Sequence, residues 1–563
     1  MLVRGASGRF MAGAALVLGV GVAIRLPGLA QSLWLDEVFR TFVSLGGERA
    51  RWLLWGDVHN PLYNLVMFAW IRVVGDGELA VRAPSVLAGF ALIAAVWFWA
   101  RSRFGVAAAN VAGAWLVVAP VHVWYSTEAK NNIVTALLAT LAVMALDGAI
   151  RRRTLGCVLG AGAAAFGAVA TDFQSLLVLG PAWVFMAWQL GRGNPRAGNA
   201  WPPGGSLLTR GLPLWASLGA GAAFLIPWTL FRLTQDAHLA RHYVGYFNWH
   251  EGLRLLLVWL PTGNVIPPLP GEGERGWHVR AMVGVVLVGP GLWAGLRAAR
   301  GTGAGRLVLL GLLAPMVLMF VGNELLVQTG SRVRLYQPRN LIVIVPWYAL
   351  VLGLGAAAPG RWKWYAAGVP LALALAGSVA MRTLWAGRES VSTPNPDWRG
   401  AGAWLRARDD PGGTRLAVLS NTILMPLEYY APGRALEQAP LTNGLMPDAE
   451  RLVESLRVRE FVLMDDPFWG PAISAADWVE LGQRFEVVER AEFRSLRVAR
   501  VRVPFRAGQE RGAGPAGLAP ASRSATAHAT SAHERGAWAS VPANSRPAAR
   551  SSGVMPRYSS SGE

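Results

Sequence analysis

The chain carries a long series of apolar runs, each close to the length that a helix needs to cross a lipid bilayer. About 20 apolar residues in helical form span the hydrocarbon core. The candidate runs are residues 10–27, 83–100, 105–122, 131–149, 155–171, 173–190, 211–231, 280–297, 306–323, 341–358 and 364–381. With 53% hydrophobic and only 15% charged residues, the composition is also that of a membrane protein. We therefore expect an α-helical polytopic membrane protein with about eleven transmembrane helices.

The connections between these runs alternate in charge, and this alternation predicts the topology. Short loops rich in Arg and Lys stay in the cytoplasm. The basic connections carry Arg4 and Arg9, Arg101 and Arg103, Arg151 to Arg153, Arg192, Arg196 and Arg210, Arg297, Arg300 and Arg306, and Arg361 with Lys363. We expect a multi-pass protein of the cell (plasma or inner) membrane, in contact with its lipids, with a cytoplasmic N-terminus. Residues 28–82 would form an outer loop with interfacial helices, because the apolar segment 61–74 is too short to span.

The net charge and the cysteine content exclude two other classes of partner and site. The formal charge is +19, but the basic residues are dispersed between apolar runs and form no continuous patch with interleaved aromatics. Nucleic acid is therefore not an expected partner. Cys157 is the only cysteine, so the chain can form neither an internal disulfide nor a cysteine-based metal cluster.

The composition changes after the last apolar run, and this change predicts the domain organisation. Residues 1–381 would form the transmembrane domain and residues 382–506 a small extracytoplasmic α/β domain. Within the latter, we expect helices at 398–408 and 448–457 and strands at 414–420, 460–464 and within 485–503. Residues 507–563 consist of Ala, Ser, Gly, Pro and Arg with few aliphatic residues, and we predict a disordered tail.

An acidic pair, Asp36-Glu37, lies just outside the first apolar run. Two carboxylates at a membrane surface can accept a proton from an acceptor hydroxyl or bind a divalent cation with further ligands. A solvated loop that is merely acidic is the alternative.

Three further outer segments carry chemically active side chains. Residues 57–63 contain an acid, an imidazole and a phenol, and residues 122–130 contain another carboxylate, Glu128. Arg332, Arg334 and Arg339 lie in a connection predicted to be outside, against the positive-inside trend. Because Arg favours phosphate through its planar fork of donors, this group suggests a phosphate-bearing ligand, with a basic surface loop as the alternative.

These segments together resemble the polyprenol-phosphate-sugar-dependent glycosyltransferases of the GT-C fold, the protein-mannosyltransferase and aminoarabinose-transferase type (glycosyltransferase families 39 and 83). The resemblance is carried by the order and spacing of several motifs. They are Trp34-Leu35-Asp36-Glu37, His59-Asn60-Pro61-Leu62-Tyr63, Gly77 to Ser85, Trp124 to Lys130, Gln337-Pro338-Arg339-Asn340 and Pro396-Asp397-Trp398-Arg399-Gly400.

The resemblance implies a role for each matching residue. Asp36 would be the general base on the acceptor, and Glu37 would assist it or help to hold a metal. Glu128 matches the second outer acidic position, so that Asp36 and Glu128 could share a divalent cation, the only cofactor expected. The residues assigned to substrate binding are His59, Tyr63, Arg82, Tyr125, Glu128, Lys130 and Arg339, with Arg339 suited to the lipid phosphate.

The expected function is therefore transfer of a sugar from a polyprenyl-phosphate donor to a lipid, glycan or protein acceptor on the outer face of the membrane. Displacing a lipid phosphate from an anomeric carbon requires a base and positive charge, and both are predicted on that face. Two alternatives stay open: a lipid or sugar transporter or flippase, and an inactive family member that acts as a scaffold through residues 382–506. The chain departs from the family pattern at several positions, among them Asn60 and Thr127.

Overall fold

A computed structural model of the chain describes most of the membrane part and most of the α/β part. The described residues are 17–46, 61–152, 155–191, 212–233, 249–263, 273–328, 338–360, 363–385, 396–408, 416–421, 424–432, 436–441, 444–456, 458–466 and 473–504. His59 and the predicted tail at 507–563 lie outside them.

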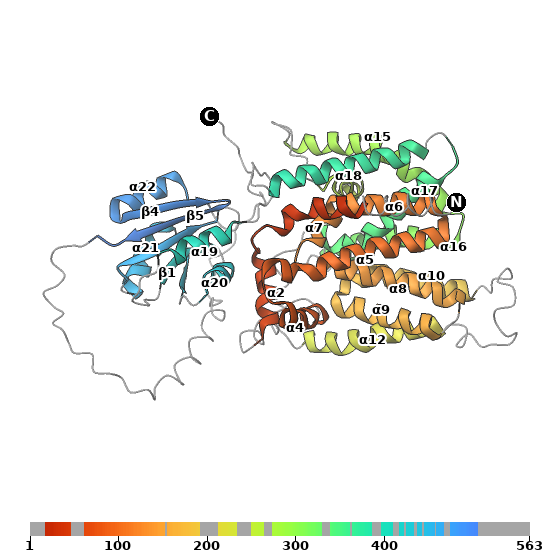
Figure 1. Ribbon diagram of the computed structural model, residues 1–563, viewed down its shortest axis with the longest axis horizontal. Helices are drawn as coiled ribbons and strands as arrows, with labels where there is room; N and C mark the ends of the chain where they lie inside the picture. Colours follow the sequence, from red (N-terminus) through yellow and green to blue (C-terminus); the bar gives the residue numbers. More distant parts are fainter. Residues whose placement is uncertain are drawn as a thin grey trace, which may run out of the picture. The chain divides into compact units, whose positions relative to one another are not determined.

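The membrane part is a bundle of long helices that lie side by side (Figure 1). A first helical stretch covers Val17–Leu29. The bundle continues with α5 (Glu78–Phe104), α6 (Val106–Val118), α7 (Pro120–Ser126), α8 (Asn132–Arg152), α9 (Leu155–Thr171), α10 (Leu176–Gly191), α12 (Leu212–Leu233), α15 (Gly273–Ala299), α16 (Gly303–Gln328), α17 (Val345–Ala357) and α18 (Lys363–Trp385), with short 3₁₀ turns η1 (Phe173–Ser175) and η4 (Pro338–Ile344). Every predicted run falls on one of these helices or on a broken pair, so the helical polytopic fold is confirmed.

Length and composition separate the described helices into two groups. Five are long and apolar enough to cross a membrane, or up to six if the bent pair α6 and α7 counts as one span. Shorter apolar helices, among them Val17–Leu29 and Leu155–Thr171, make up most of the difference from the predicted number. The angle within the bent pair is 59°.

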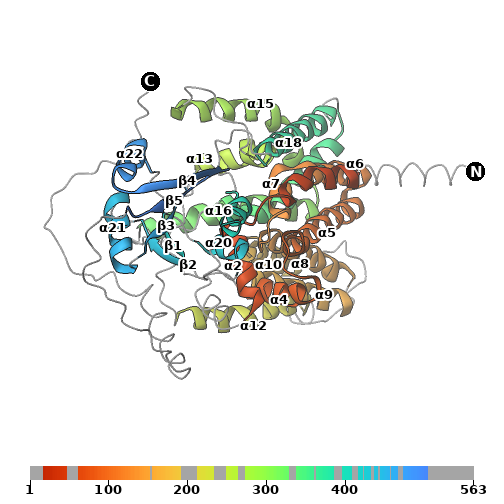
Figure 2. The same ribbon diagram turned by 60° about the vertical axis from the view of Figure 1, so that its left-hand side comes forward.

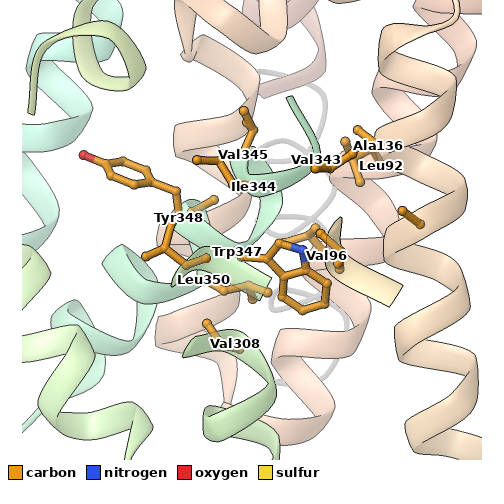
Figure 3. Close-up of a cluster of buried hydrophobic side chains, with 14 of the residues drawn as sticks. Leu92, Val96, Ala136, Val308, Val343, Ile344, Val345, Trp347, Tyr348 and Leu350 are labelled. Atoms are coloured by element: carbon orange, nitrogen blue, oxygen red, sulfur yellow. The ribbon is translucent and has the colours of Figure 1, made fainter. Parts of the chain in front are cut away.

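Small residues and one large aromatic side chain explain how the bundle packs. A Cβ at Gly295 of α15 would lie 1.9 Å from the Val351 carbonyl oxygen of α17, so only glycine allows these backbones to approach so closely. A Cβ at Gly311 of α16 would meet the buried indole of Trp347. Figure 3 shows Trp347 among the apolar side chains that surround it, which include Val96 and Val308.

Two shorter helices, α2 (Leu35–Leu45) and α4 (Leu62–Val74), contact each other and lie at the end of the bundle where α5 begins (Figure 1). With 13 residues, α4 is shorter than a span, as the sequence predicts. The sequence does not predict α2, and Asp36 and Glu37 therefore occupy the first turn of a helix, where carboxylates are favourable. A broken segment formed by α13 (Trp249–Arg254), the π-helix η3 (Leu255–Trp259) and α14 (Leu260–Thr262) is also unpredicted.

The C-terminal part is a five-stranded sheet with strand order β2-β1-β3-β5-β4. Its strands are β1 (Leu416–Ser420), β2 (Leu436–Pro440), β3 (Glu460–Asp465), β4 (Glu486–Phe493) and β5 (Leu496–Arg502), and its helices are α19 (Trp398–Arg406), α20 (Met425–Tyr430), α21 (Leu445–Leu456) and α22 (Ala475–Arg484). Strand β1 pairs in parallel with β2 and β3, whereas β5 pairs antiparallel with β3 and β4. The predicted α/β character is confirmed, although the sequence does not predict α20, β2 or α22.

The two faces of this sheet form separate cores, because side chains alternate along each strand. Val462 and Met464 of β3 pack with α19 and α20, whereas Phe461 and Leu463 pack with α21 and α22. In Figure 2 the sheet accordingly separates α21 and α22 from α20.

Replacing Gly295 with Ala should destabilise the bundle, because the new methyl group would overlap the Val351 carbonyl. Overpacking of this kind costs about 1–3 kcal/mol. Gly289→Ala in the same helix is the matched control, since its Cβ would make only ordinary contact with Val285. Thermal unfolding of the purified protein in detergent should show a lower Tm for Gly295→Ala alone, and equal Tm values for the two variants would contradict the close approach.

Candidate functional site

Asp36 lies in the first turn of α2 and forms an ion pair with Lys130. The Asp36 side chain is 34% exposed, whereas that of Lys130 is 5% exposed. The Lys130 ammonium also lies over the Trp34 ring, 4.1 Å from its centroid. A buried ammonium thus pairs with a carboxylate that is partly exposed.

Glu37, the next residue, is completely buried, and both of its oxygens accept hydrogen bonds. Oε1 accepts from Arg82 Nε at 2.8 Å and from the backbone N–H of Ala129 at 2.8 Å. Oε2 accepts from Arg82 Nη2 at 2.6 Å and from the backbone N–H of Trp34 at 3.2 Å. Glu37 therefore joins the start of α2, the start of α5 and the loop that follows α7.

Arg82 uses every donor of its guanidinium within the protein. Nη1 donates to the carbonyls of Leu29 and Gln31 at 3.0 and 2.6 Å, and Nη2 donates to that of Ser32 at 3.1 Å. With its bonds to Glu37, these account for all five N–H groups that an arginine offers. The geometry therefore favours a positioning role for Glu37 and Arg82 over the catalytic and substrate-binding roles that the resemblance implies.

Glu128 lies in the turn after α7, with one oxygen engaged and one free. Oε1 accepts from Trp124 Nε1 at 2.6 Å, while Oε2 is buried and has no hydrogen-bond partner among the described residues. Burial raises the pKa of Glu128 to about 7, and the charges of Glu37 and Asp36 add to the effect, whereas Lys130 opposes it. Glu128 can therefore exchange a proton near neutral pH.

Tyr63 of α4 is connected to the same loop through Ser85. Its hydroxyl lies 3.5 Å from Ser85 Oγ, which in turn donates to the carbonyl of Lys130 at 3.3 Å. Tyr63 is 2% exposed, and burial raises the pKa of its hydroxyl. Tyr125 of α7 is also buried, and its ring centroid lies 6.4 Å from that of Trp259.

The structure thus connects most of the predicted site residues through contacts. Those joined around the start of α2 are Asp36, Glu37, Tyr63, Arg82, Glu128 and Lys130. The roles of all the predicted site residues stay predictions. His59 lies outside the described residues, and for Arg339 the structure describes only the backbone, in η4.

The described donors do not fit a resident divalent cation. Among them there is no group of three or more His, Cys, Asp or Glu residues that could hold a metal. A divalent cation such as Ca²⁺ takes six to eight oxygen ligands. Lys130 already supplies a positive charge at Asp36, so a metal shared with Glu128 would have to displace that ammonium.

The sequence gives no indication of how the C-terminal part contacts the residues before Asp36. We call residues 29–34 the strap. The hydroxyl of Tyr430 accepts from the backbone N–H of Leu33, Ser32 Oγ donates to the carbonyl of Pro396 at 2.7 Å, and Arg399 donates to that of Ala30 at 3.2 Å. The strap is therefore held by Arg82 on one side and by the α/β part on the other.

A separate hollow of about 830 Å³ lies between α10 and α16. The described residues that line it are apolar, such as Val184 and Leu318, apart from Arg306. None of the described residues that line it is an Asp or a Glu.

Comparison with known proteins gives a family match over part of the chain and a structural match to its fold. Residues 58–208 match the family model of dolichyl-phosphate-mannose-protein mannosyltransferases. No curated protein sequence matches the chain. A crystal structure of ArnT from Cupriavidus metallidurans bound to undecaprenyl phosphate has a TM-score of 0.54 at 14% identity, and the match covers 87% of this chain and 98% of ArnT.

A crystal structure of the Archaeoglobus fulgidus oligosaccharyltransferase, in complex with Zn and sulfate, matches with a TM-score of 0.40 at 14% identity, over 79% of this chain and 67% of that one. The likeness to ArnT confirms the GT-C fold. The family match and this fold together support a GT-C glycosyltransferase that takes its sugar from a lipid carrier.

Removing one member of the Glu37–Arg82 pair should destabilise the protein strongly, because the other charge is left buried and unpaired. Arg82→Met leaves a buried carboxylate uncompensated, at a cost of about 3–5 kcal/mol. Glu37→Met/Arg82→Met removes that charge as well, so its loss of stability should be smaller than the sum of the single variants. Tm measurements across this double-mutant cycle test the pair, with Arg101→Met as the control, and strictly additive losses would contradict it.

Glu128 should make stability depend on pH in a defined direction. Because its pKa rises from the ordinary 4.5 to about 7 in the folded protein, the native state binds the proton more tightly than the unfolded state. Its contribution is complete below pH 4.5 and is lost as the pH rises through about 7. The Tm of the wild type relative to that of Glu128→Gln should therefore fall across this window, and a constant difference would contradict the shifted pKa.

Proposed function

We propose that the protein transfers a sugar from a polyprenyl-phosphate carrier to a hydroxyl group of a lipid, glycan or protein acceptor at the outer face of the cell membrane. The observation that carries this proposal is the pairing of the partly exposed Asp36 carboxylate with the buried Lys130 ammonium, beside the protonatable Glu128. One position thus offers a base, a fixed cation and a group that titrates near neutral pH.

The reaction needs these groups in separate roles. An acceptor hydroxyl attacks the anomeric carbon, the bond from that carbon to the phosphate oxygen breaks, and the hydroxyl proton passes to Asp36. The electron pair of the broken bond leaves with the lipid phosphate, whose charge a nearby ammonium stabilises. A single displacement of this kind inverts the anomeric configuration.

The choice of donor rests on the comparisons and on the sequence. The family model is named for dolichyl-phosphate-mannose, and the ArnT structure contains undecaprenyl phosphate, so both descriptions name a polyprenyl-type phosphate. We assign Arg339 and His59 to the phosphate end of the donor, as the resemblance implies. The alternating basic connections support an outer site with a cytoplasmic N-terminus.

Asp36→Asn should reduce transfer by about 10²- to 10⁴-fold, the usual contribution of a general base. The side chain keeps its size but can no longer accept the proton. The assay is transfer of radiolabel from polyprenyl-phosphate sugars in membranes to endogenous acceptors, normalised to the amount of folded protein.

Asp76→Asn is the matched control, since Asp76 is an exposed acid in the connection before α5. It should retain full activity. Full activity in Asp36→Asn would eliminate Asp36 as the base, and the absence of transfer from the wild type would favour an inactive scaffold.

Removal of divalent cations should leave transfer unchanged, because Lys130 supplies the positive charge at Asp36. Membranes treated with EDTA and dialysed should keep the activity of untreated membranes. A loss that Mg²⁺ or Mn²⁺ restores would show instead that Asp36 and Glu128 share a metal during the reaction.

A further inference from the structure

The span formed by α6 and α7 breaks next to the site, and the break leaves backbone carbonyls without their helical partners. Ala119 is extended, and Pro120, which lacks an N–H, begins α7. In a membrane such freed carbonyls need other donors. Ser378 of α18 donates to the Val118 carbonyl at 2.6 Å, and Arg25 donates to that of Val117 at 3.2 Å.

Arg25, in the first helical stretch, bridges both sides of this break. In addition to Val117 at the end of α6, it contacts two side chains of α7: Nε donates to Ser126 Oγ at 2.8 Å, and Nη2 lies 2.9 Å from His122 Nδ1. Nη1 also donates to the Gly21 carbonyl of its own helix at 2.8 Å. One guanidinium thus fixes the angle between α6 and α7.

The placement of this cation is costly, and a simple packing role would not require it. Arg25 is 1% exposed and forms no ion pair with a carboxylate in the described part of the chain. An ionisable residue buried in the membrane part of a protein carries a large desolvation penalty and usually marks a function. Since the guanidinium only donates, His122 accepts at Nδ1 and is held as the neutral ring with its proton on Nε2.

The end of α7 leads directly into the site. Ser126, which Arg25 contacts, is followed by Thr127 and Glu128, and Lys130 comes two residues later. Glu37 binds the N–H of Ala129 within the same turn. The angle of α7 therefore sets where Glu128 and Lys130 stand relative to Asp36.

We propose that Arg25 is a positioning residue of the site, which places Glu128 and Lys130 against Asp36 by fixing the break between α6 and α7. The role in transfer rests on the proposed function, but the positioning itself can be measured without activity. Arg25 would touch neither substrate nor the reacting atoms.

The test combines hydrogen exchange with kinetics in two variants. Arg25→Lys keeps the positive charge but loses the planar guanidinium that reaches both α6 and α7. Ser126→Ala removes only the hydroxyl that accepts from Arg25 Nε, and this variant should fold. In both, amide exchange of residues 124–131 should become about tenfold faster, because that segment opens more often, while residues 139–149 of α8 stay unchanged. Arg101→Lys, an exposed arginine on α5, should change neither segment.

Kinetic measurements on the same variants test whether a displaced 124–131 segment lowers the rate of transfer. Misplacement of about 1 Å can cost up to about 100-fold in rate, so kcat should fall by about 10- to 100-fold while the KM for the polyprenyl-phosphate sugar changes little. Any pH dependence of kcat that Glu128→Gln removes should also shift in both variants. A merely structural role would lower the Tm and leave the KM, the kcat and the pH profile of the folded protein unaltered.

The outcomes separate the two proposals. If the wild type shows no transfer but the amides of residues 124–131 exchange faster in both variants, the proposed function is wrong and the positioning role of Arg25 is supported. If the wild type transfers sugar and both folded variants keep wild-type exchange and kcat, the inference about Arg25 is overturned.

Discussion

The buried pair of Glu37 and Arg82 is the interaction on which the rest of the site depends. Both side chains are almost inaccessible, 1% and 2% exposed, so their mutual neutralisation is what makes either charge tolerable there. Between them they bind the start of α2, the loop after α7 and three carbonyls of the strap. Removing the pair would take these hydrogen bonds away from α2, the loop after α7 and the strap.

This arrangement gives Asp36 and Glu37 different surroundings. Successive residues of a helix point about 100° apart, so two neighbours in the first turn of α2 cannot face the same environment. Glu37 faces inward and is saturated with donors, while Asp36 faces outward with Lys130 behind it. The two adjacent acids therefore differ in environment: Glu37 is buried and fully hydrogen-bonded, whereas the Asp36 side chain is 34% exposed.

Periodicity and charge were sufficient to predict the bundle, because each bilayer-length run is a local property of the chain. They could not predict α2, which is short and carries Asp36, Glu37 and Arg40 among its apolar residues. Nor could they pair Glu37 with Arg82, since no local pattern connects residues 45 positions apart. The resemblance assigns Asp36, Glu128 and Lys130 to the site, and these roles stay predictions. No sequence pattern shows that all five N–H donors of Arg82 are used within the protein.

Breaks in the spans recur around the site, and each one is stabilised by a side chain from a different helix. Arg25 and Ser378 serve the break between α6 and α7, and the hydroxyl of Tyr348 donates to the Leu256 carbonyl of the π-helix η3 at 3.0 Å. Irregular backbone within a membrane persists only where such donors replace the lost helical bonds. Arg25, Ser378 and Tyr348 thus shape the bundle by donating to carbonyls that have lost their helical partners. These donors are needed because the bilayer core contains no water that could replace them.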